Sequence, residues 1–329
     1  MKRINIGLLG LGNIGTGTYK ALEMNRDIIV ARTGLDFEIT RILEKFVDRD
    51  RGITVPTEKF TQDPQTIWND PEIDIVIELL GGIEPATSFM LEAIKHGKHV
   101  VTANKAALAT NYEALQTAAK ENNVMLRFEA SVGGGIPVLN ALTTALLANE
   151  YEEIVGILNG TTNYILTKMT EEGLEYEDVL KDAQAKGFAE ANPTADVEGI
   201  DACNKLSILI SLVFGQRIRP EDIPTTGITG ITKEDINQAK ADGQVIKLLA
   251  SAKTQANGLQ YAVAPVRLDR SHPLASVGNE FNALFVTGNA VGDLMFYGKG
   301  AGPLPTASAV LGDVIEISRA IAKGSAYDI

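Results

Sequence analysis

Cysteine and histidine are scarce in this 329-residue sequence, which has one cysteine and three histidines. The single thiol, Cys203, cannot form an internal disulfide, so the chain is compatible with a reducing cytoplasm. His96, His99 and His272 occur without any cysteine cluster, which argues against a catalytic zinc site. A disulfide scaffold and a zinc enzyme are therefore both disfavoured.

Long apolar runs and net positive charge are also missing. The uncharged run over residues 206–216 is too short to cross a bilayer, and the apolar stretch after the basic N-terminus is too short for a signal peptide. A net charge of -12 repels phosphate backbones and anionic lipids, so no nucleic-acid or membrane partner is expected. We expect a cytoplasmic protein that acts on a small molecule.

Alternating strand and helix patterns dominate the first part of the chain. Apolar runs at residues 4–9, 39–47, 73–77, 99–102 and 124–128 predict strands, and helices are predicted over 13–24, 85–95 and 112–121. This rhythm predicts an α/β fold whose N-terminal part is a doubly wound parallel sheet of the Rossmann type.

The rhythm changes at the glycine run of residues 131–137, which predicts a domain boundary near residue 130. Beyond it, helices are predicted over 138–148, 163–170, 176–185, 197–214 and 304–322, and strands over 154–158, 260–268 and 282–286. The length of the chain allows this second α/β domain, in which we expect a mixed sheet.

A glycine fingerprint, G-x-G-x-x-G, follows the first predicted strand; it consists of Gly10, Leu11, Gly12, Asn13, Ile14 and Gly15. The first glycine permits a tight turn, the second lets the backbone approach a pyrophosphate, and the third allows close packing of the helix. The open N–H groups at the start of that helix favour phosphate. The position between strand and helix favours dinucleotide binding over a purely structural turn.

The end of the second strand should decide between NAD and NADP. It carries Arg41, Glu44 and Lys45, of which a carboxylate would favour the ribose hydroxyls of NAD and a cation the 2′-phosphate of NADP. All three could equally be solvated surface charges. Because one residue of register decides which side chain faces the ligand, the cofactor stays open between NAD and NADP.

Six further motifs resemble those of homoserine dehydrogenases: residues 77–86 (IELLGGIEPA), 100–105 (VVTANK), 156–165 (GILNGTTNYI), 187–193 (GFAEANP), 196–205 (DVEGIDACNK) and 300–306 (GAGPLPT). The resemblance runs in order from residue 3 to about residue 320. It implies nicotinamide-dependent interconversion of L-homoserine and L-aspartate 4-semialdehyde, in threonine and methionine biosynthesis, by a homodimer or homotetramer. No kinase precedes the fingerprint and no regulatory domain follows the last helix, so we expect a minimal, monofunctional member.

The resemblance also implies a role for each part of the chain. Residues 1–130 would bind the dinucleotide, and residues 131–302 would form the substrate-binding, catalytic and dimerisation domain. Residues 303–329 would be a C-terminal helix that completes the dimerisation and nucleotide-binding region.

Two lysines and an aspartate carry the expected chemistry. Asp201 and Lys205 are spaced i, i+4 on a predicted helix, so both side chains lie on one face. Spacing alone favours an ordinary surface ion pair, whereas the resemblance makes Lys205 the acid–base group and places Asp201 at the substrate. It also places Lys105 between cofactor and substrate, where an ammonium could polarise the aldehyde oxygen; a solvated loop lysine is the alternative.

The resemblance implies further ligand contacts. Glu190 would hold the ammonium of the substrate, with Asp196 in support, and Gly187 and Gly302 would approach the cofactor closely. Without a ligand, these glycines would be tight turns. Two threonines open the predicted helix at 163–170 and could cap it or approach a ligand: Thr161 and Thr162.

The segment 129–136 resembles a monovalent-cation loop. The resemblance implies that backbone carbonyls of Glu129, Val132, Gly134 and Ile136 bind Na⁺, a hard cation that prefers oxygen ligands. A glycine hinge without an ion is an equal alternative.

Two rival functions remain at this point. Aspartate-semialdehyde dehydrogenase would need a thiolate nucleophile, for which only Cys203 is available, and that residue has the character of a small packing side chain. A nucleotide-sensing regulator would keep the glycine fingerprint but would not need Lys105, Glu190, Asp201 and Lys205 together.

Overall fold

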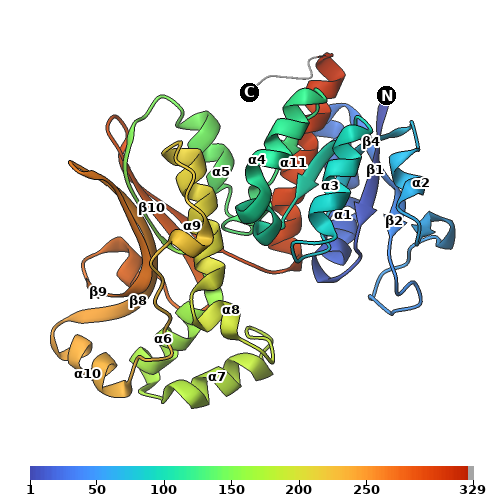
Figure 1. Ribbon diagram of the computed structural model, residues 1–329. Coiled ribbons are helices and arrows are strands. Elements are labelled where there is room, and N and C mark those ends of the chain that lie inside the picture. Colours follow the sequence, from blue (N-terminus) through green and yellow to red (C-terminus); the bar gives the residue numbers. More distant parts are fainter. Residues whose placement is uncertain (325–329) are drawn as a thin grey trace. The chain divides into compact units, whose positions relative to one another are not determined.

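The computed structural model describes residues 1–324, which form two compact units (Figure 1). The first unit contains Met1–Gly135 together with the segment that begins at Gly302, and the second unit is Ile136–Ala301. Residues 325–329 of the C-terminal segment lie outside the described part. The chain therefore leaves the first unit, builds the second, and returns to the first.

Six parallel strands form the sheet of the first unit, in the order β3-β2-β1-β4-β5-β6. The strands are β1 (Lys2–Leu9), β2 (Leu35–Leu43), β3 (Phe60–Thr61), β4 (Ile73–Glu78), β5 (His99–Thr102) and β6 (Leu126–Arg127). Ile4, Ile6, Ile75 and Ile77 in the central strands are fully buried, as expected of a parallel sheet that is covered on both faces. The predicted Rossmann-type sheet is confirmed.

Five helices accompany this sheet: α1 (Asn13–Thr33), α2 (Gln65–Trp68), α3 (Ala86–Lys95), α4 (Lys105–Glu121) and α11 (Pro303–Lys323). The C-terminal helix α11 packs directly against α1 (Figure 1). A Cβ atom on Gly17 would lie only 2.4 Å from the carbonyl oxygen of Pro303, so the two helices approach this closely because position 17 is glycine. This contact brings the start of α11 beside the glycine loop.

Five strands form the sheet of the second unit, in the order β11-β10-β7-β8-β9. They are β7 (Tyr151–Ile157), β8 (Gln244–Gln255), β9 (Gly258–Asp269), β10 (Phe281–Gly288) and β11 (Gly292–Lys299). Every ladder is antiparallel, so the sheet is not mixed. The short connections of β8 to β9 and of β10 to β11 require two of these ladders to be antiparallel, since only antiparallel strands can be joined by tight turns.

The helices of the second unit are α5 (Val138–Asn140), α6 (Gly160–Glu172), α7 (Tyr176–Ala185), α8 (Thr194–Val197), α9 (Ile200–Val213) and α10 (Lys233–Ala241). A π-helical turn, Ala141–Ala145, continues α5 without a break, so the helix predicted over 138–148 is confirmed as helical but is wrong at its end. The helix predicted over 197–214 is also wrong at its start, because Gly199 adopts φ +81° and separates α8 from α9.

Other predicted boundaries are wrong where caps, and not apolar residues, decide them. The helix predicted to end at residue 24 continues to Thr33 and stops at Gly34, which adopts the left-handed φ of +72°. Helix α4 begins at Lys105, where the Asn104 side chain caps it, but its backbone is non-helical at Asn111 (φ -121°, ψ 20°). The helix predicted from residue 112 therefore matches the second part of α4, and the part before the kink was not predicted. The second strand ends at Leu43, before the predicted end at residue 47.

Candidate active site

The glycine loop between β1 and α1 has the backbone shape that a nucleotide phosphate needs. Gly10 adopts φ +92°, and a Cβ on Gly15 would lie 2.2 Å from the Gly10 carbonyl oxygen. A Cβ on Gly12 would meet nothing within 4 Å, so its backbone is open to a ligand. Gly12 is the N-cap of α1 and has no side chain to occupy the N–H groups of the first turn, which includes Asn13 and Ile14.

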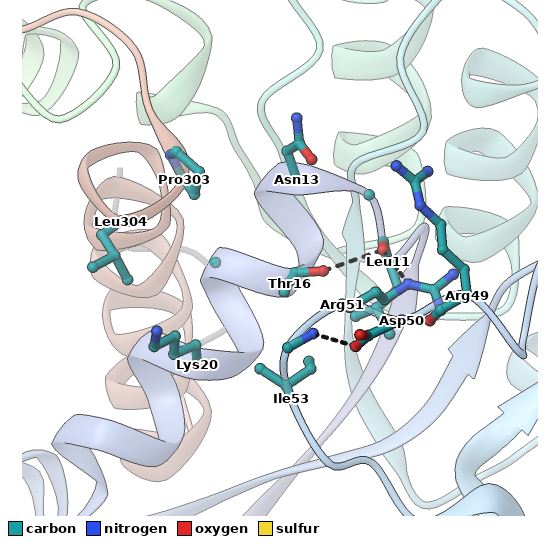
Figure 2. Close-up of a pocket in the computed structure, with 13 residues that line it drawn as sticks. Leu11, Asn13, Thr16, Lys20, Arg49, Asp50, Arg51, Ile53, Pro303 and Leu304 are labelled. Atoms are coloured by element: carbon teal, nitrogen blue, oxygen red, sulfur yellow. Dashed lines mark hydrogen bonds between the residues drawn. The ribbon is translucent and has the colours of Figure 1, made fainter. Parts of the chain in front are cut away.

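A pocket opens beside this loop (Figure 2). Its lining consists of Leu11, Gly12, Asn13, Thr16, Gly17, Lys20, Arg49, Asp50, Arg51, Gly52, Ile53, Pro303 and Leu304. Figure 2 shows the segment from Arg49 to Ile53 on one side of α1, and Pro303 and Leu304 of α11 on the other. Three of its four charged side chains are basic, which suits a phosphate-bearing ligand.

The carboxylate at the end of β2 is engaged with the protein. Glu44 Oε2 accepts a hydrogen bond from Leu11 N at 2.9 Å, and Oε1 accepts one from Phe46 N at 2.9 Å. Arg51 Nη2 lies 3.3 Å from Glu44 Oε2, and Arg51 Nε donates to Leu11 O at 2.7 Å. Burial alone would raise the pKa of the Glu44 carboxyl, but the backbone hydrogen bonds and Arg51 hold that pKa below its ordinary value. Glu44 and Arg51 therefore form a charged clamp on the glycine loop.

The other two charges considered at this strand end do not line the pocket. Arg41 donates to the carbonyl oxygens of Thr40 and Glu58, and Lys45 is exposed. Arg49, which does line the pocket, was not among the candidates from the sequence. The run Asp48-Arg49-Asp50-Arg51-Gly52 after the strand was the signal that could have pointed to it.

Lys105 begins α4 and is half-buried, so it is a helical residue and not a loop lysine. The preceding Asn104 caps the helix and donates from Nδ2 to Gly82 O at 2.7 Å. Fully buried Glu78, at the end of β4, accepts a hydrogen bond from Thr102 Oγ1 at 2.6 Å. These bonds join the ends of β4 and β5 and hold the turn that presents Lys105 at the carboxyl edge of the sheet.

Asp201 and Lys205 form a buried ion pair on α9. Lys205 Nζ lies 2.7 Å from Asp201 Oδ2, and the two side chains are only 8% and 6% exposed. Lys205 Nζ also donates to the carbonyl oxygen of Leu158, at 2.6 Å. The predicted shared face is therefore confirmed, and burial excludes the alternative of an ordinary surface pair. Removing either partner would leave a buried charge, which is strongly unfavourable.

Asn159 joins this pair to Asp196. Its Nδ2 donates to Asp196 Oδ1 at 2.7 Å and to Asp201 Oδ2 at 2.9 Å. Its Oδ1 accepts from Thr162 N at 2.8 Å, which makes Asn159 the N-cap of α6. The suggestion that a threonine caps this helix is thus wrong. Asn159 was not predicted from the sequence as a site residue, although the N-G-T sequence before a helix is a signal for such a cap.

The loop that carries Glu190 is held from two sides. Gln184 Nε2 donates to the Glu190 carbonyl oxygen at 3.1 Å, and Thr161 Oγ1 donates to the Phe188 carbonyl oxygen at 2.6 Å. The Glu190 side chain is exposed. Gly187 adopts φ +76°, and a Cβ there would meet nothing within 4 Å. Glycine is therefore favoured at this position by the left-handed φ and not by crowding.

The second unit therefore brings Asp196, Asp201 and Lys205 into one hydrogen-bonded cluster. Glu190 lies in the same unit, on the exposed loop between α7 and α8. Lys105 and the glycine loop lie in the first unit, together with Gly302, which adopts φ +119° as the N-cap of α11.

Comparisons with known proteins give the family. A family model described as the NAD-binding domain of homoserine dehydrogenase matches residues 10–129, and one described as homoserine dehydrogenase matches residues 137–315. The chain is 43% identical over 319 residues to a homoserine dehydrogenase of Bacillus subtilis (strain 168), covering 97% of this chain and 74% of that protein. The chain belongs to the homoserine dehydrogenase family.

Solved structures of homoserine dehydrogenases have the same fold. One from Thiobacillus denitrificans superposes with a TM-score of 0.95 at 43% identity, covering 98% of this chain and 75% of that one. A hyperthermophilic archaeal homoserine dehydrogenase in complex with NADPH gives a TM-score of 0.81 at 26% identity, covering 96% and 98%. The predicted family, fold class and reaction are confirmed: the chain is an NAD(P)-dependent oxidoreductase that interconverts L-homoserine and L-aspartate 4-semialdehyde.

Membership in the homoserine dehydrogenase family agrees with the environment of the only cysteine. Cys203 is 4% exposed, and its thiol donates to the Pro220 carbonyl oxygen at 3.0 Å. Burial raises the pKa of this thiol, which disfavours the thiolate that an aldehyde-oxidising rival would need. Among residues 1–324, no helix is long and apolar enough to span a membrane.

The residues of the expected cation loop lie at the end of the first unit and the start of the second. Buried Glu129 opens a short 3-10 turn, and its backbone N donates to Asp313 Oδ2 at 2.8 Å. Val132 is fully buried, Gly134 adopts φ +57°, and Ile136 begins the second unit. Across residues 1–324 there is no group of three or more His, Cys, Asp or Glu side chains that could hold a metal ion.

Proposed function

We propose that the buried Asp201–Lys205 pair moves the proton when this chain interconverts L-homoserine and L-aspartate 4-semialdehyde. A bound nicotinamide would supply the hydride acceptor or donor. In the oxidation direction, Lys205 Nζ in its neutral form takes up the hydroxyl proton, and in the reduction direction it returns that proton to the aldehyde oxygen. Asp201 orients the amine and balances the ammonium form. The observation that carries this proposal is the burial of both partners at a separation of 2.7 Å.

The substrate is a zwitterion, and the carboxylates of the second unit suit its ammonium group. We propose that Glu190 binds the ammonium and that Asp196 assists, because Glu190 is exposed on a loop held by Gln184 and Thr161. Lys105, at the first turn of α4, is proposed to place a second ammonium at the substrate oxygen, where it would stabilise developing negative charge.

The cofactor site is proposed to be the glycine loop and the pocket beside it, including Gly302 at the start of α11, with Gly187 approaching the cofactor from its loop. The pocket favours NADP over NAD on charge. Glu44 already accepts hydrogen bonds from Leu11 N and Phe46 N, so it is not placed to select ribose hydroxyls. Arg49 lines the pocket and is exposed, and its guanidinium forms no hydrogen bond or ion pair with another side chain or backbone group of residues 1–324, which suits a 2′-phosphate.

A change of Lys205 to alanine tests the proton-handling role. Lys205→Ala should reduce kcat by about a hundredfold or more, the usual contribution of general acid–base catalysis, with little change in NADP affinity. The matched control is Lys168→Ala, since Lys168 pairs with Glu172 at the same i, i+4 spacing but is more exposed. Glu190→Gln should mainly raise the KM for homoserine. A Lys205→Ala enzyme with the turnover of the control would remove the proposed role.

Cofactor selection has a test that does not depend on turnover. Calorimetry with 2′,5′-ADP and with 5′-AMP measures how much the 2′-phosphate contributes to binding. Arg49→Ala should weaken 2′,5′-ADP binding by about tenfold, the value of one charge-assisted contact, and leave 5′-AMP binding unchanged. Lys45→Ala, at an exposed lysine outside the pocket lining, is the control. Equal losses for both ligands would contradict a phosphate role for Arg49.

The remaining proposals concern the roles of the two units, the oligomeric state, the cellular compartment and a bound ion. We propose that the first unit binds the nucleotide and the second the substrate, in a cytoplasmic homodimer or homotetramer. A lone, buried cysteine suits a reducing compartment. A Na⁺ ion is proposed at the backbone carbonyls of Glu129, Val132, Gly134 and Ile136. Sedimentation measures the assembly, and thermal stability in Na⁺ against a larger organic cation tests the ion, since an ion that binds the folded state raises the Tm.

A further inference from the structure

The turn between β7 and α6 contacts three functional side chains of the second unit. Asn159, in this turn, is 5% exposed and donates from a single Nδ2 to Asp196 and to Asp201, at 2.7 and 2.9 Å. The residue before it, Leu158, accepts the hydrogen bond from Lys205 Nζ. The turn therefore holds the proposed acid–base lysine through its backbone and the two carboxylates through its side chain.

The chemistry of the amide matters at this place. Two carboxylates within hydrogen-bond reach of one atom repel each other, and a neutral donor between them satisfies an oxygen of each without adding charge. Asp201 Oδ2 is the oxygen that receives both Asn159 Nδ2 and Lys205 Nζ. The direction in which Asp201 holds the lysine therefore depends on where Asn159 holds Asp201.

Asn159 itself is held firmly. Its Oδ1 accepts from Thr162 N at 2.8 Å and from Thr162 Oγ1 at 3.0 Å, so the amide plane is oriented by the first turn of α6. With the oxygen fixed on the helix side, the NH₂ group must face the carboxylates. One side chain thus connects α6 with Asp196 of α8 and with Asp201 of α9.

We propose that Asn159 is a positioning residue of the reaction, whose neutral NH₂ group holds Asp196 and Asp201 apart and sets the orientation of Lys205. This inference rests on the proposed roles of Asp201 and Lys205. The competing explanation is that Asn159 serves only as the N-cap of α6, and the two explanations differ in what an aspartate at this position would do.

Asn159→Asp separates capping from positioning. Aspartate caps a helix as well as asparagine does, and its charge suits the helix N-terminus. It replaces the shared donor by a third carboxylate, which should turn Asp201 and Lys205 away from their present geometry. We expect kcat for homoserine oxidation to fall by about a hundredfold, the size of effect that a misplacement of about 1 Å produces. Because position 159 is buried, the third carboxylate should also lower the Tm, so circular dichroism must show that the variant is folded at the temperature of the assay.

The pH profile supplies a readout that a purely structural role would not move. When protonated, the carboxyl that Asn159→Asp introduces can donate one hydrogen bond, so the rate of this variant relative to wild type should rise as the pH falls. Asn159→Ser is the second variant, since serine keeps a capping oxygen but is too short to bridge two carboxylates. It should lose kcat to a similar extent, with no such relative recovery at low pH.

The outcomes separate the two explanations. Wild-type kcat and pH profile in either folded variant would overturn the positioning role, and so would loss of folding in both variants, because a structural role would then suffice. If only Asn159→Asp fails to fold, Asn159→Ser decides. Lys205→Ala is measured in parallel: full activity in that variant would remove the proposed function itself, whereas its inactivity beside an active Asn159→Asp would remove only this inference.

Discussion

Replacing Gly17 by alanine should separate two helices that the nucleotide pocket needs together. A Cβ at this position would lie 2.4 Å from the Pro303 carbonyl oxygen and 2.7 Å from its carbonyl carbon, where ordinary contact begins at 3.4 Å. Both atoms belong to the backbone of α11, so no side chain can turn aside. Helices α1 and α11 must move apart by about 1 Å, and core overpacking of this kind costs about 1–3 kcal/mol.

Alanine also stabilises the helix itself, and this gain must be subtracted from the cost of overpacking. In a helix interior alanine is favoured over glycine by roughly 1 kcal/mol, so the net loss for Gly17→Ala should be up to about 2 kcal/mol. The matched control is Gly312→Ala, in the interior of α11. Gly312 is exposed and a Cβ there would meet nothing within 4 Å, so this change should stabilise the protein by up to about 1 kcal/mol.

Urea unfolding followed by tryptophan fluorescence measures the stability change of both variants in the unit that contains both glycines. The only tryptophan, Trp68, is 2% exposed and lies in the first unit with both glycines. Gly17→Ala should lower the urea midpoint by roughly 0.5 M, and Gly312→Ala should raise it. Because Gly17 and Pro303 both line the pocket, Gly17→Ala should also weaken NADP binding. A Gly17→Ala protein as stable as Gly312→Ala would refute the close packing of α1 against α11.

Two further predictions concern the second unit. Burial lowers the pKa of Lys247 from 10.5 to about 8, so between these pH values the unfolded chain binds more protons and the free energy of unfolding should rise with pH, by up to about 3 kcal/mol from this group. Lys247→Met should lose that slope in urea titrations at successive pH values, and parallel slopes would contradict the assignment. Cys203→Ser should keep homoserine oxidation within about threefold of wild type, because its buried thiol has no place in hydride transfer. Inactivity of a Cys203→Ser protein of native stability would instead favour thiolate chemistry.

Some features of the site follow from neighbouring residues, and these were predictable. The glycine loop is encoded within six residues, since two of its glycines answer a local steric need: Gly10 a positive φ, and Gly15 a close approach to the Gly10 carbonyl. The shared face of Asp201 and Lys205 follows from helical periodicity alone. The parallel sheet follows from repeated apolar strands separated by helices.

Helix ends and several elements of the second unit were harder to predict. The exposed second half of α1 has little apolar pattern, so its continuation to Thr33 depends on backbone bonding and on Gly34. The sequence pattern did not predict strands β8 and β11 or helix α10. Outer strands such as β11 alternate between exposed and half-buried residues, which weakens the apolar signal.

The sequence by itself determined the chemistry available to this protein: a phosphate-binding glycine loop, an aspartate and a lysine one helical turn apart, and motifs that carry the family. Only the tertiary structure decided how that chemistry is arranged. It buried the Asp201–Lys205 pair, joined Glu44 to the glycine loop by a hydrogen bond, and placed Asn159 between two carboxylates. The reason is physical: periodicity and sterics act over a few residues, whereas burial and hydrogen-bond partners come from segments far apart in the chain.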